Sequence, residues 1–204
     1  MPRDRAQTRQ TILKAAYVLF RRSGFTRVSM DEIAEASELT KRTLYAHFRS
    51  KDDLLTAVLE DQHGMAYEAF QTFGQKLKGT PEEIVKAFFA DLAAWAAQPR
   101  WPGSGFTRLA MELADLPGHP ARKIASRHKG QLEQHLAELL GRAGVPNAER
   151  MARQIWILSE GAIALIFIRG DRSYAKAAEE AALAIVAQNA TESGRVQRRP
   201  GKGA

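Results

Sequence analysis

Two helix start signals, separated by a short turn, occupy residues 29–48 of this 204-residue chain and constrain its fold most strongly. The first is Ser29 with Glu32 three residues later, the pattern of a capping box in which each side chain satisfies a backbone amide of the other. The second is Thr40, whose hydroxyl can accept from the free amides of a first helical turn. Residues 37–39 between the two predicted helices are long enough for the sharp turn of a helix-turn-helix.

Basic side chains open the second of these helices, which begins Lys41-Arg42-Thr43 and continues through Tyr45 and His47. Cations in a first helical turn oppose the helix dipole. The pattern therefore favours an anion outside this end of the helix. Capped helix pairs are also common without any ligand, so the spacing alone leaves DNA binding and a purely structural hairpin both open.

Charge is divided unevenly along the chain. Residues 1–50 contain 10 Lys/Arg and 5 Asp/Glu, residues 191–204 contain 4 and 1, and residues 51–190 contain 16 and 17. The positive excess therefore lies with the helix-turn-helix and the C-terminal tail. This is the distribution expected when one domain meets phosphates and the other does not.

Cap and breaker signals predict roughly nine helices, and no segment alternates with the period of a strand, so the expected fold class is all-α. A helix over about residues 8–23 is expected to end at Gly24, with Phe25 folding back on Phe20. Three segments are expected: a helix-turn-helix domain over 1–50 with a supporting helix that starts at 51, a second helical domain over 51–190, and a disordered basic tail over 191–204. The later predicted helices start near residues 81, 106, 121, 147 and 173, the first of them marked by Thr80-Pro81 with Glu83 completing a capping box.

Residues 8–60 resemble the tetracycline-repressor (TetR) family. The matching segments are R-R-S-G-F, T-R-V-S-M-D-E-I-A, L-T-K-R-T-L-Y-A-H-F and R-S-K-D-D-L-L. The resemblance implies a homodimeric regulator, more often a repressor, whose N-terminal domain binds a palindromic operator and whose C-terminal domain binds a small ligand. By position, it implies DNA-binding roles for Ser29, Thr40, Lys41, Arg42, Thr43, Tyr45, His47 and Lys51, with Ser29 and Lys51 on phosphates and Arg42 on guanine or phosphate.

Two positions depart from the family pattern. Glu38 stands in the turn where the family usually has glycine, and a left-handed backbone there costs a residue with a side chain about 1 kcal/mol. Arg42 stands where a small residue is frequent.

Aromatic and polar residues of the C-terminal half are candidates for a small-molecule cavity. His128 and Gln131 flank the apolar stripe of one predicted helix, and such cavities are usually apolar with a few polar groups. The candidate ligand-binding residues are Phe70, Phe88, Trp95, Phe106, His128, Gln131 and Trp156, which favours a largely apolar effector. Core packing is the alternative for each of them, and Glu112 or Glu160 would select a cationic ligand only if buried.

The last two predicted helices, about Asn147–Arg169 and Ser173–Gln188, are expected to form the homodimer interface. The first is apolar on nearly every side, and the second is rich in alanine, which allows close helix packing. Burial within one subunit is the alternative.

Other classes of function are poorly supported by the sequence. The chain has no cysteine, and no catalytic or nucleotide-binding motif is found, so neither an enzyme nor a metal or cofactor site is expected. The N-terminus is polar, and the apolar run Ile155–Ile168 is interrupted and short, so a cytoplasmic protein without a membrane span is expected. An interaction protein that does not bind DNA would leave the basic N-terminal half unexplained.

Overall fold

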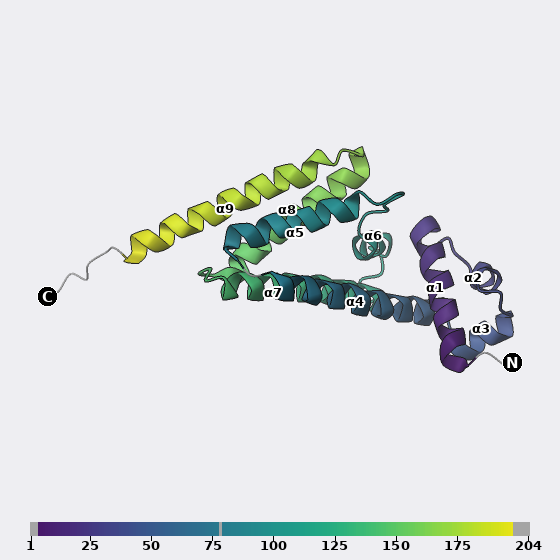
Figure 1. Cartoon of the computed structure of the whole chain (residues 1–204). Coiled ribbons are helices and arrows are strands. Elements are labelled where there is room, and N and C mark those ends of the chain that lie inside the picture. Colours follow the sequence, from purple (N-terminus) through teal and green to yellow (C-terminus); the bar gives the residue numbers. More distant parts are fainter. Residues whose placement is uncertain (1–3, 78, 198–204) are drawn as a thin grey trace. The chain divides into compact units, whose positions relative to one another are not determined.

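The computed structural model describes residues 4–77 and 79–197, and its described part is all-α, as predicted (Figure 1). Its nine helices are α1 (Arg5–Ser23), α2 (Met30–Ala36), α3 (Lys41–His47), α4 (Lys51–Lys76), α5 (Pro81–Ala96), α6 (Gly105–Glu112), α7 (Pro120–Arg142), α8 (Ala148–Arg169) and α9 (Ser173–Gln197). They fall into two compact units. Unit 1 comprises residues 1–68 and 104–129, and unit 2 comprises residues 69–103 and 130–204.

Unit 1 is built around a small core beneath the helix-turn-helix. Ile12 of α1, Ile33 of α2 and Leu44 of α3 are fully buried together, and Phe48 closes the cluster. Leu54 from the first turns of α4 joins them. Burial of each such side chain contributes about 1.5–3 kcal/mol relative to exposure, which explains why helices as short as α2 and α3 persist.

A second cluster in unit 1 joins α6 and the first turns of α7 to α1 and α4. Phe25, Leu55, Leu109 and Ala121 are among its buried members. The Phe20 and Phe25 rings meet edge to face, 5.4 Å between centroids, as the Gly24 ending predicts. Unit 1 therefore extends beyond the expected boundary at residue 51, because α6 and residues 120–129 pack on the N-terminal helices rather than in the second domain.

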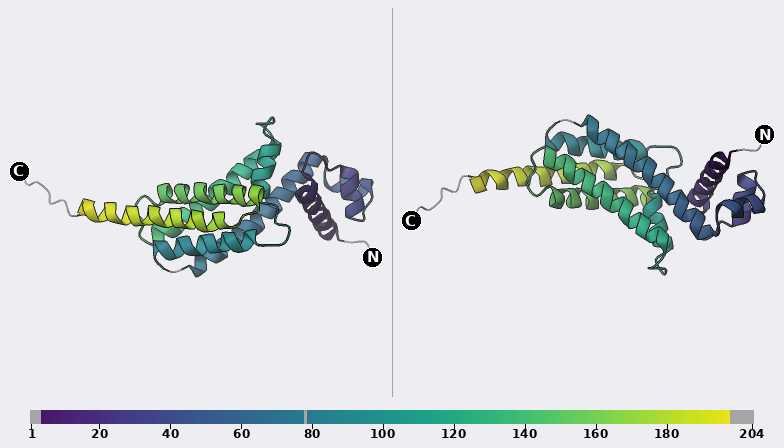
Figure 2. Two further views of the ribbon diagram at one scale, coloured as in Figure 1. Left: turned by 90° about the horizontal axis from the view of Figure 1, so that it is seen from above. Right: turned by 90° about the horizontal axis from the view of Figure 1, so that it is seen from below.

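Unit 2 contains α5, α8 and α9, which lie side by side (Figures 1 and 2). Its core includes Phe89 of α5, Leu140 of α7, Ile155 of α8 and Ala182 of α9. The α8 helix is long and apolar enough to cross a membrane by length and composition, and 33% of its most apolar stretch is buried in the chain. The core helices of soluble proteins can be equally long and apolar, so this property shows only that α8 has apolar surface that the rest of the chain leaves uncovered.

The predicted caps form at most helix starts. Ser29 and Glu32 make a capping box, as do Thr80 and Glu83, and the Thr40 hydroxyl accepts from the Thr43 amide at 3.1 Å. These side chains satisfy first-turn amides that have no helical partner. The capping signals therefore placed α2, α3 and α5 correctly.

Three helix ends differ from expectation. The first helix begins at Arg5 because Asp4 serves as its N-cap. Asn147 lies at the predicted cap of α8, but it has a left-handed backbone and makes no side-chain capping bond. The last helix continues to Gln197 instead of ending near residue 188, so residues 191–197 are helical where a disordered tail was expected; no proline interrupts this segment, and Gly194 lies within the helix. The remainder of that tail, 198–204, lies outside the described residues.

Candidate nucleic-acid interface

The turn between α2 and α3 is tight. Ser37 ends α2 with its hydroxyl donating to the Ile33 carbonyl at 2.7 Å, and Leu39 N donates to the Ala34 carbonyl at 3.0 Å. Glu38 between them has φ +55°, the left-handed conformation that its position in the turn predicted. The packing of α2 and α3 into the core on either side of the turn keeps Glu38 in this left-handed conformation.

The α3 helix presents one face to solvent while Leu44 anchors the other. Arg42 and Tyr45 are exposed, Tyr45 to 51%, and they lie three residues apart on the same face. His47 and Thr43 are half-buried. The exposed face thus offers a guanidinium, a phenol and the methyl group of Ala46, which are groups suited to base edges and phosphates.

Lys41 is paired with a residue that sequence reasoning did not single out. Its ammonium lies 2.6 Å from the Asp31 carboxylate of α2, and this hydrogen bond raises the pKa of Lys41. Both side chains are exposed, so the pair contributes little to stability. Its effect is on charge: Asp31 offsets the positive charge of Lys41 next to Arg42. The available signal for this ion pair in the sequence was the position of Asp31 and Lys41, ten residues apart, at the starts of the two helices that the turn joins.

Ser29 and Thr40, the two capping residues expected to contact DNA, make hydrogen bonds within their own helices. The Glu32 carboxylate accepts from Ser29 N at 2.7 Å and from the Ser29 hydroxyl at 2.8 Å, and these bonds lower the pKa of Glu32. The Thr40 hydroxyl lies 2.9 Å from that of Thr43. Both remain at the surface, but each contributes first to the start of its helix.

Lys51 lies at the first turn of α4 with its ammonium among backbone carbonyls. It donates to Phe25 O at 3.0 Å, to Thr26 O at 3.2 Å and to Val28 O at 3.0 Å. An ammonium has three donors, so these contacts use all of them. Lys51 therefore binds the protein backbone, whereas Arg42 and Tyr45 are exposed to solvent.

The seven candidate ligand residues fall in different units. Phe106 and His128 belong to unit 1, and the other five belong to unit 2. Within unit 2, the Phe88 ring lies 6.2 Å from that of Phe70 and 6.1 Å from that of Trp156. Trp95 meets Trp101 edge to face at 5.1 Å, and Gln131 is exposed. Unit 2 thus brings together the aromatic trio of Phe70, Phe88 and Trp156.

His128 of unit 1 has a partner that the sequence did not predict. Its Nδ1 lies 2.9 Å from Nδ1 of His63, and its ring stacks on Phe106 at 3.7 Å between centroids. Burial lowers the pKa of His128 to about 3, with smaller contributions from Lys129, His63 and Arg127. The ring is therefore neutral at ordinary pH and joins α7 to α4 and α6.

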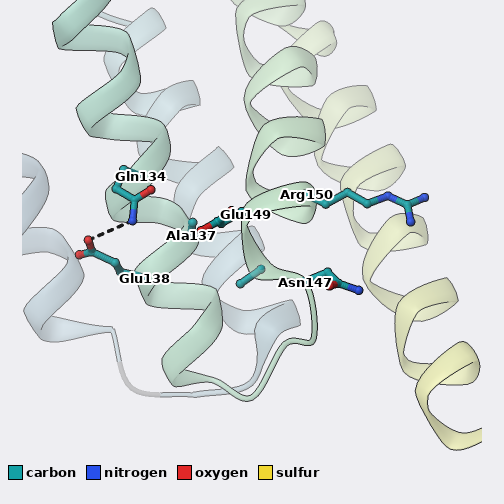
Figure 3. Close-up of a pocket in the computed structure, with 7 residues that line it drawn as sticks. Gln134, Ala137, Glu138, Asn147, Glu149 and Arg150 are labelled. Atoms are coloured by element: carbon teal, nitrogen blue, oxygen red, sulfur yellow. Dashed lines mark hydrogen bonds between the residues drawn. The ribbon is translucent and has the colours of Figure 1, made fainter. Parts of the chain in front are cut away.

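A cavity of about 690 Å³ opens between the end of α7 and the start of α8 in unit 2 (Figure 3). Apart from two alanines its lining residues have polar or charged side chains; the lining consists of Gln134, Ala137, Glu138, Asn147, Ala148, Glu149 and Arg150. Gln134 donates to Glu138 across one wall at 3.4 Å. This lining differs from the predicted aromatic set. Among the described residues, no three His, Asp or Glu side chains gather in the way a metal site requires.

Comparison with known proteins identifies the helix-turn-helix. Residues 12–58 match the family "Bacterial regulatory proteins, tetR family". The chain is 32% identical over 80 residues to the HTH-type transcriptional regulator AcrR of Shigella flexneri, covering 39% of this chain and 37% of that one. It is 32% identical over 87 residues to the HTH-type transcriptional repressor NicS of Pseudomonas putida, covering 41% and 39%. The matches thus span about two fifths of the length of these curated relatives.

The similarity of fold covers most of the chain. A putative TetR transcriptional regulator from Streptomyces avermitilis superposes with a TM-score of 0.72 and 26% identity, covering 86% of this chain and 97% of that one. The family resemblance drawn from residues 8–60 is therefore confirmed.

Proposed function

We propose that the chain, whose residues 12–58 match the tetR family of bacterial regulatory proteins, is a transcriptional regulator that binds a palindromic DNA operator. The observation that supports this most is the exposed face of α3, with Arg42 and Tyr45 held outward by the buried Leu44. A short helix presented in this way fits the major groove, where its first residues meet base edges.

The charge of the N-terminal segment supports DNA as the partner. Residues 1–50 contain 10 Lys/Arg against 5 Asp/Glu, and the contacts of such a surface with phosphates release counterions. Binding is therefore expected to weaken steeply as salt increases. Because Asp31 offsets Lys41, we assign base reading to Arg42 and the positions beside it, Thr43 and Tyr45.

The experiment uses Arg42→Ala and fluorescence anisotropy with DNA that flanks the protein's own gene, beside random DNA of equal length. Loss of a bidentate guanine contact should weaken operator binding by about 1–3 kcal/mol and reduce the preference over random DNA. Arg150→Ala, an exposed arginine of unit 2, is the matched control and should bind normally. Equal losses on both DNAs would refute base reading by Arg42, and a wild-type chain that ignores all DNA would refute the proposed function.

We propose that two chains associate through α8 and α9. Exposed apolar or small side chains recur along α8 at Ile157, Gly161, Leu165 and Ile168, spaced for one face of a helix. The exposed face of α9 offers Ala177, Ala181 and Ala184. Two copies related by a two-fold axis would cover both faces and match the symmetry of a palindromic operator.

The effector site is proposed in unit 2 around Phe70, Phe88 and Trp156. The Phe88 ring lies close to each of the other two, and a largely apolar compound could separate the rings and pack against their faces. A ligand acts by preferring the conformation in which DNA binding is weak. Repression, by analogy with the relative named as a repressor, and a cytoplasmic location belong to the same proposal. An enzyme or a DNA-independent interaction protein is the alternative, and it predicts no operator binding.

A further inference from the structure

The backbone corner between α1 and α2 is held from two sides by opposite charges. This corner, residues 24–28, directly precedes Ser29, the N-cap of α2. Lys51 of α4 binds its carbonyls, and Glu112 of α6 binds its amides. Every member of this arrangement lies within unit 1.

The Glu112 carboxylate accepts three hydrogen bonds from the corner: from Phe25 N at 3.1 Å, from Thr26 N at 2.7 Å and from the Thr26 hydroxyl at 2.6 Å. Successive backbone amides that converge in this way form a natural anion site. Although partial burial raises the pKa of Glu112, the bonds from Thr26 and Phe25 outweigh it, so the pKa is lowered and the group stays ionised.

Gly24 makes the approach of this carboxylate possible. Its φ is +85°, and a β-carbon at that position would lie 3.2 Å from Glu112 Oε1. A side chain at residue 24 would therefore crowd the carboxylate as well as strain the backbone. A neighbouring contact strengthens the attachment of α6: Arg108 Nη1 donates at 3.2 Å to the Arg21 carbonyl in the last turn of α1.

The Lys51 ammonium holds the opposite edge of the corner. Besides its three carbonyl acceptors, it lies 4.5 Å from the centre of the Phe25 ring, an additional attraction for a cation. A DNA phosphate would have to take a donor from a carbonyl to bind this group. The side chain is thus committed to the protein backbone, although its position had suggested a phosphate contact.

We propose that Lys51 and Glu112 are positioning residues that clamp the α1–α2 corner and so hold α2 and α3 in the orientation that reads DNA. The clamp ties α6 to the reading helices, because any shift of α6 must either move the corner or break the Glu112 hydrogen bonds. This inference rests on the proposed DNA-binding function, but the hold on the corner can be measured without DNA.

The test uses the full chain with Glu112→Gln, Lys51→Met and the milder Thr26→Val, which removes only the hydroxyl donor. Glu138→Gln and Lys86→Gln, exposed groups of unit 2, control for the change in charge. Amide exchange of Phe25 and Thr26 is followed by NMR in the absence of DNA. Affinity for the flanking DNA is then measured over a range of salt concentrations, well below the unfolding temperature of each variant.

The clamp variants should exchange these two amides about tenfold faster or more. They should also bind DNA about fivefold more weakly, because the entropic cost of ordering the corner then reduces the binding free energy. The salt slope should be unchanged, because the bound state keeps its phosphate contacts. Thr26→Val should change in the same direction by less, and it remains informative if the other two do not fold.

Two results would overturn the inference. Normal exchange at Phe25 and Thr26 in Glu112→Gln would show that the carboxylate does not hold the corner. A lower salt slope in Lys51→Met, by about one, with normal exchange would identify Lys51 as a phosphate contact instead. If the wild-type chain binds no DNA, the proposed function fails and the reading role with it, whereas the exchange data still decide whether the clamp exists.

Discussion

Glu38 adopts a backbone conformation that is unfavourable for a residue with a side chain. The α2–α3 turn needs a left-handed residue, and a glutamate there, at φ +55°, is less favourable than a glycine. The conformation was expected from the resemblance to the TetR family, which usually has glycine at this position of the turn.

Glu38→Gly should therefore stabilise the chain by about 0.5–1 kcal/mol, the relief of strain being partly offset by the greater freedom of glycine when unfolded. Urea unfolding followed by circular dichroism measures the change. Glu38→Ala keeps the strain and serves as the control, so it should gain nothing. A midpoint for Glu38→Gly at or below that of the wild type would contradict the prediction.

The roles of Lys51 and Glu112 were not accessible from the sequence. Local signals such as Ser29 with Glu32 act within one turn of a helix, so the sequence alone is enough to locate them. Lys51 and Glu112 instead meet a corner that lies 23 or more residues away along the chain. Contacts of this separation depend on how helices pack, and no periodicity encodes them.

At the scale of elements, α7 is joined to α4 and α6 through His128. This side chain is 5% exposed, and its pKa is lowered to about 3, whereas an unfolded histidine titrates near 6.5. Between these values the unfolded chain binds a proton that the folded chain does not. Stability is consequently complete above the unfolded pKa and is lost as the pH falls below it.

Between pH 7.5 and 5.5, this histidine should reduce the free energy of unfolding by about 1.4 kcal/mol. His128→Phe, which can keep the stacking on Phe106, should remove that part of the pH dependence. Urea unfolding of both proteins at the two pH values tests this, with His47→Phe as a control at a less buried histidine. Equal pH dependence in wild type and His128→Phe would show that His128 titrates normally.

The helix starts were the most predictable elements, and the helix ends and helix partners were the least. Thr80-Pro81 and Thr40 each marked a start correctly, because capping is a local interaction. The α9 helix was predicted to stop too early, because the polar composition of the tail suggested disorder although no proline interrupts the helix before Gln197. The seven candidate ligand residues were predicted as one group, but Phe106 and His128 lie in unit 1 and the other five in unit 2, because α7 contributes to both units.

At the scale of the whole molecule, α8 leaves apolar side chains uncovered. Ile157 is 65% exposed and Ile168 is 74% exposed. Burial of an isoleucine contributes about 1.5–3 kcal/mol, and two-fold symmetry counts each one twice. We therefore expect these side chains to form the proposed contact between two chains.

Ile157→Glu should convert a dimer into single chains, as measured by sedimentation or light scattering at micromolar concentration, and should weaken operator binding because one half-site remains. Met111→Glu alters an equally exposed residue of unit 1, 70% exposed, and should leave the dimer intact. A wild-type mass of one chain, or a dimer that survives Ile157→Glu, would contradict the proposed interface.

The split of unit 1 between residues 1–68 and 104–129 has a consequence for synthesis on the ribosome. The helix-turn-helix is made first, but the corner that leads into it lacks Glu112 until α6 has been translated. Glu112 follows Glu68 by 44 residues, and their synthesis takes roughly 2–9 s at typical rates of elongation. During that interval the nascent reading helices have their small core without their clamp, and the unit becomes complete only after part of unit 2 has already emerged.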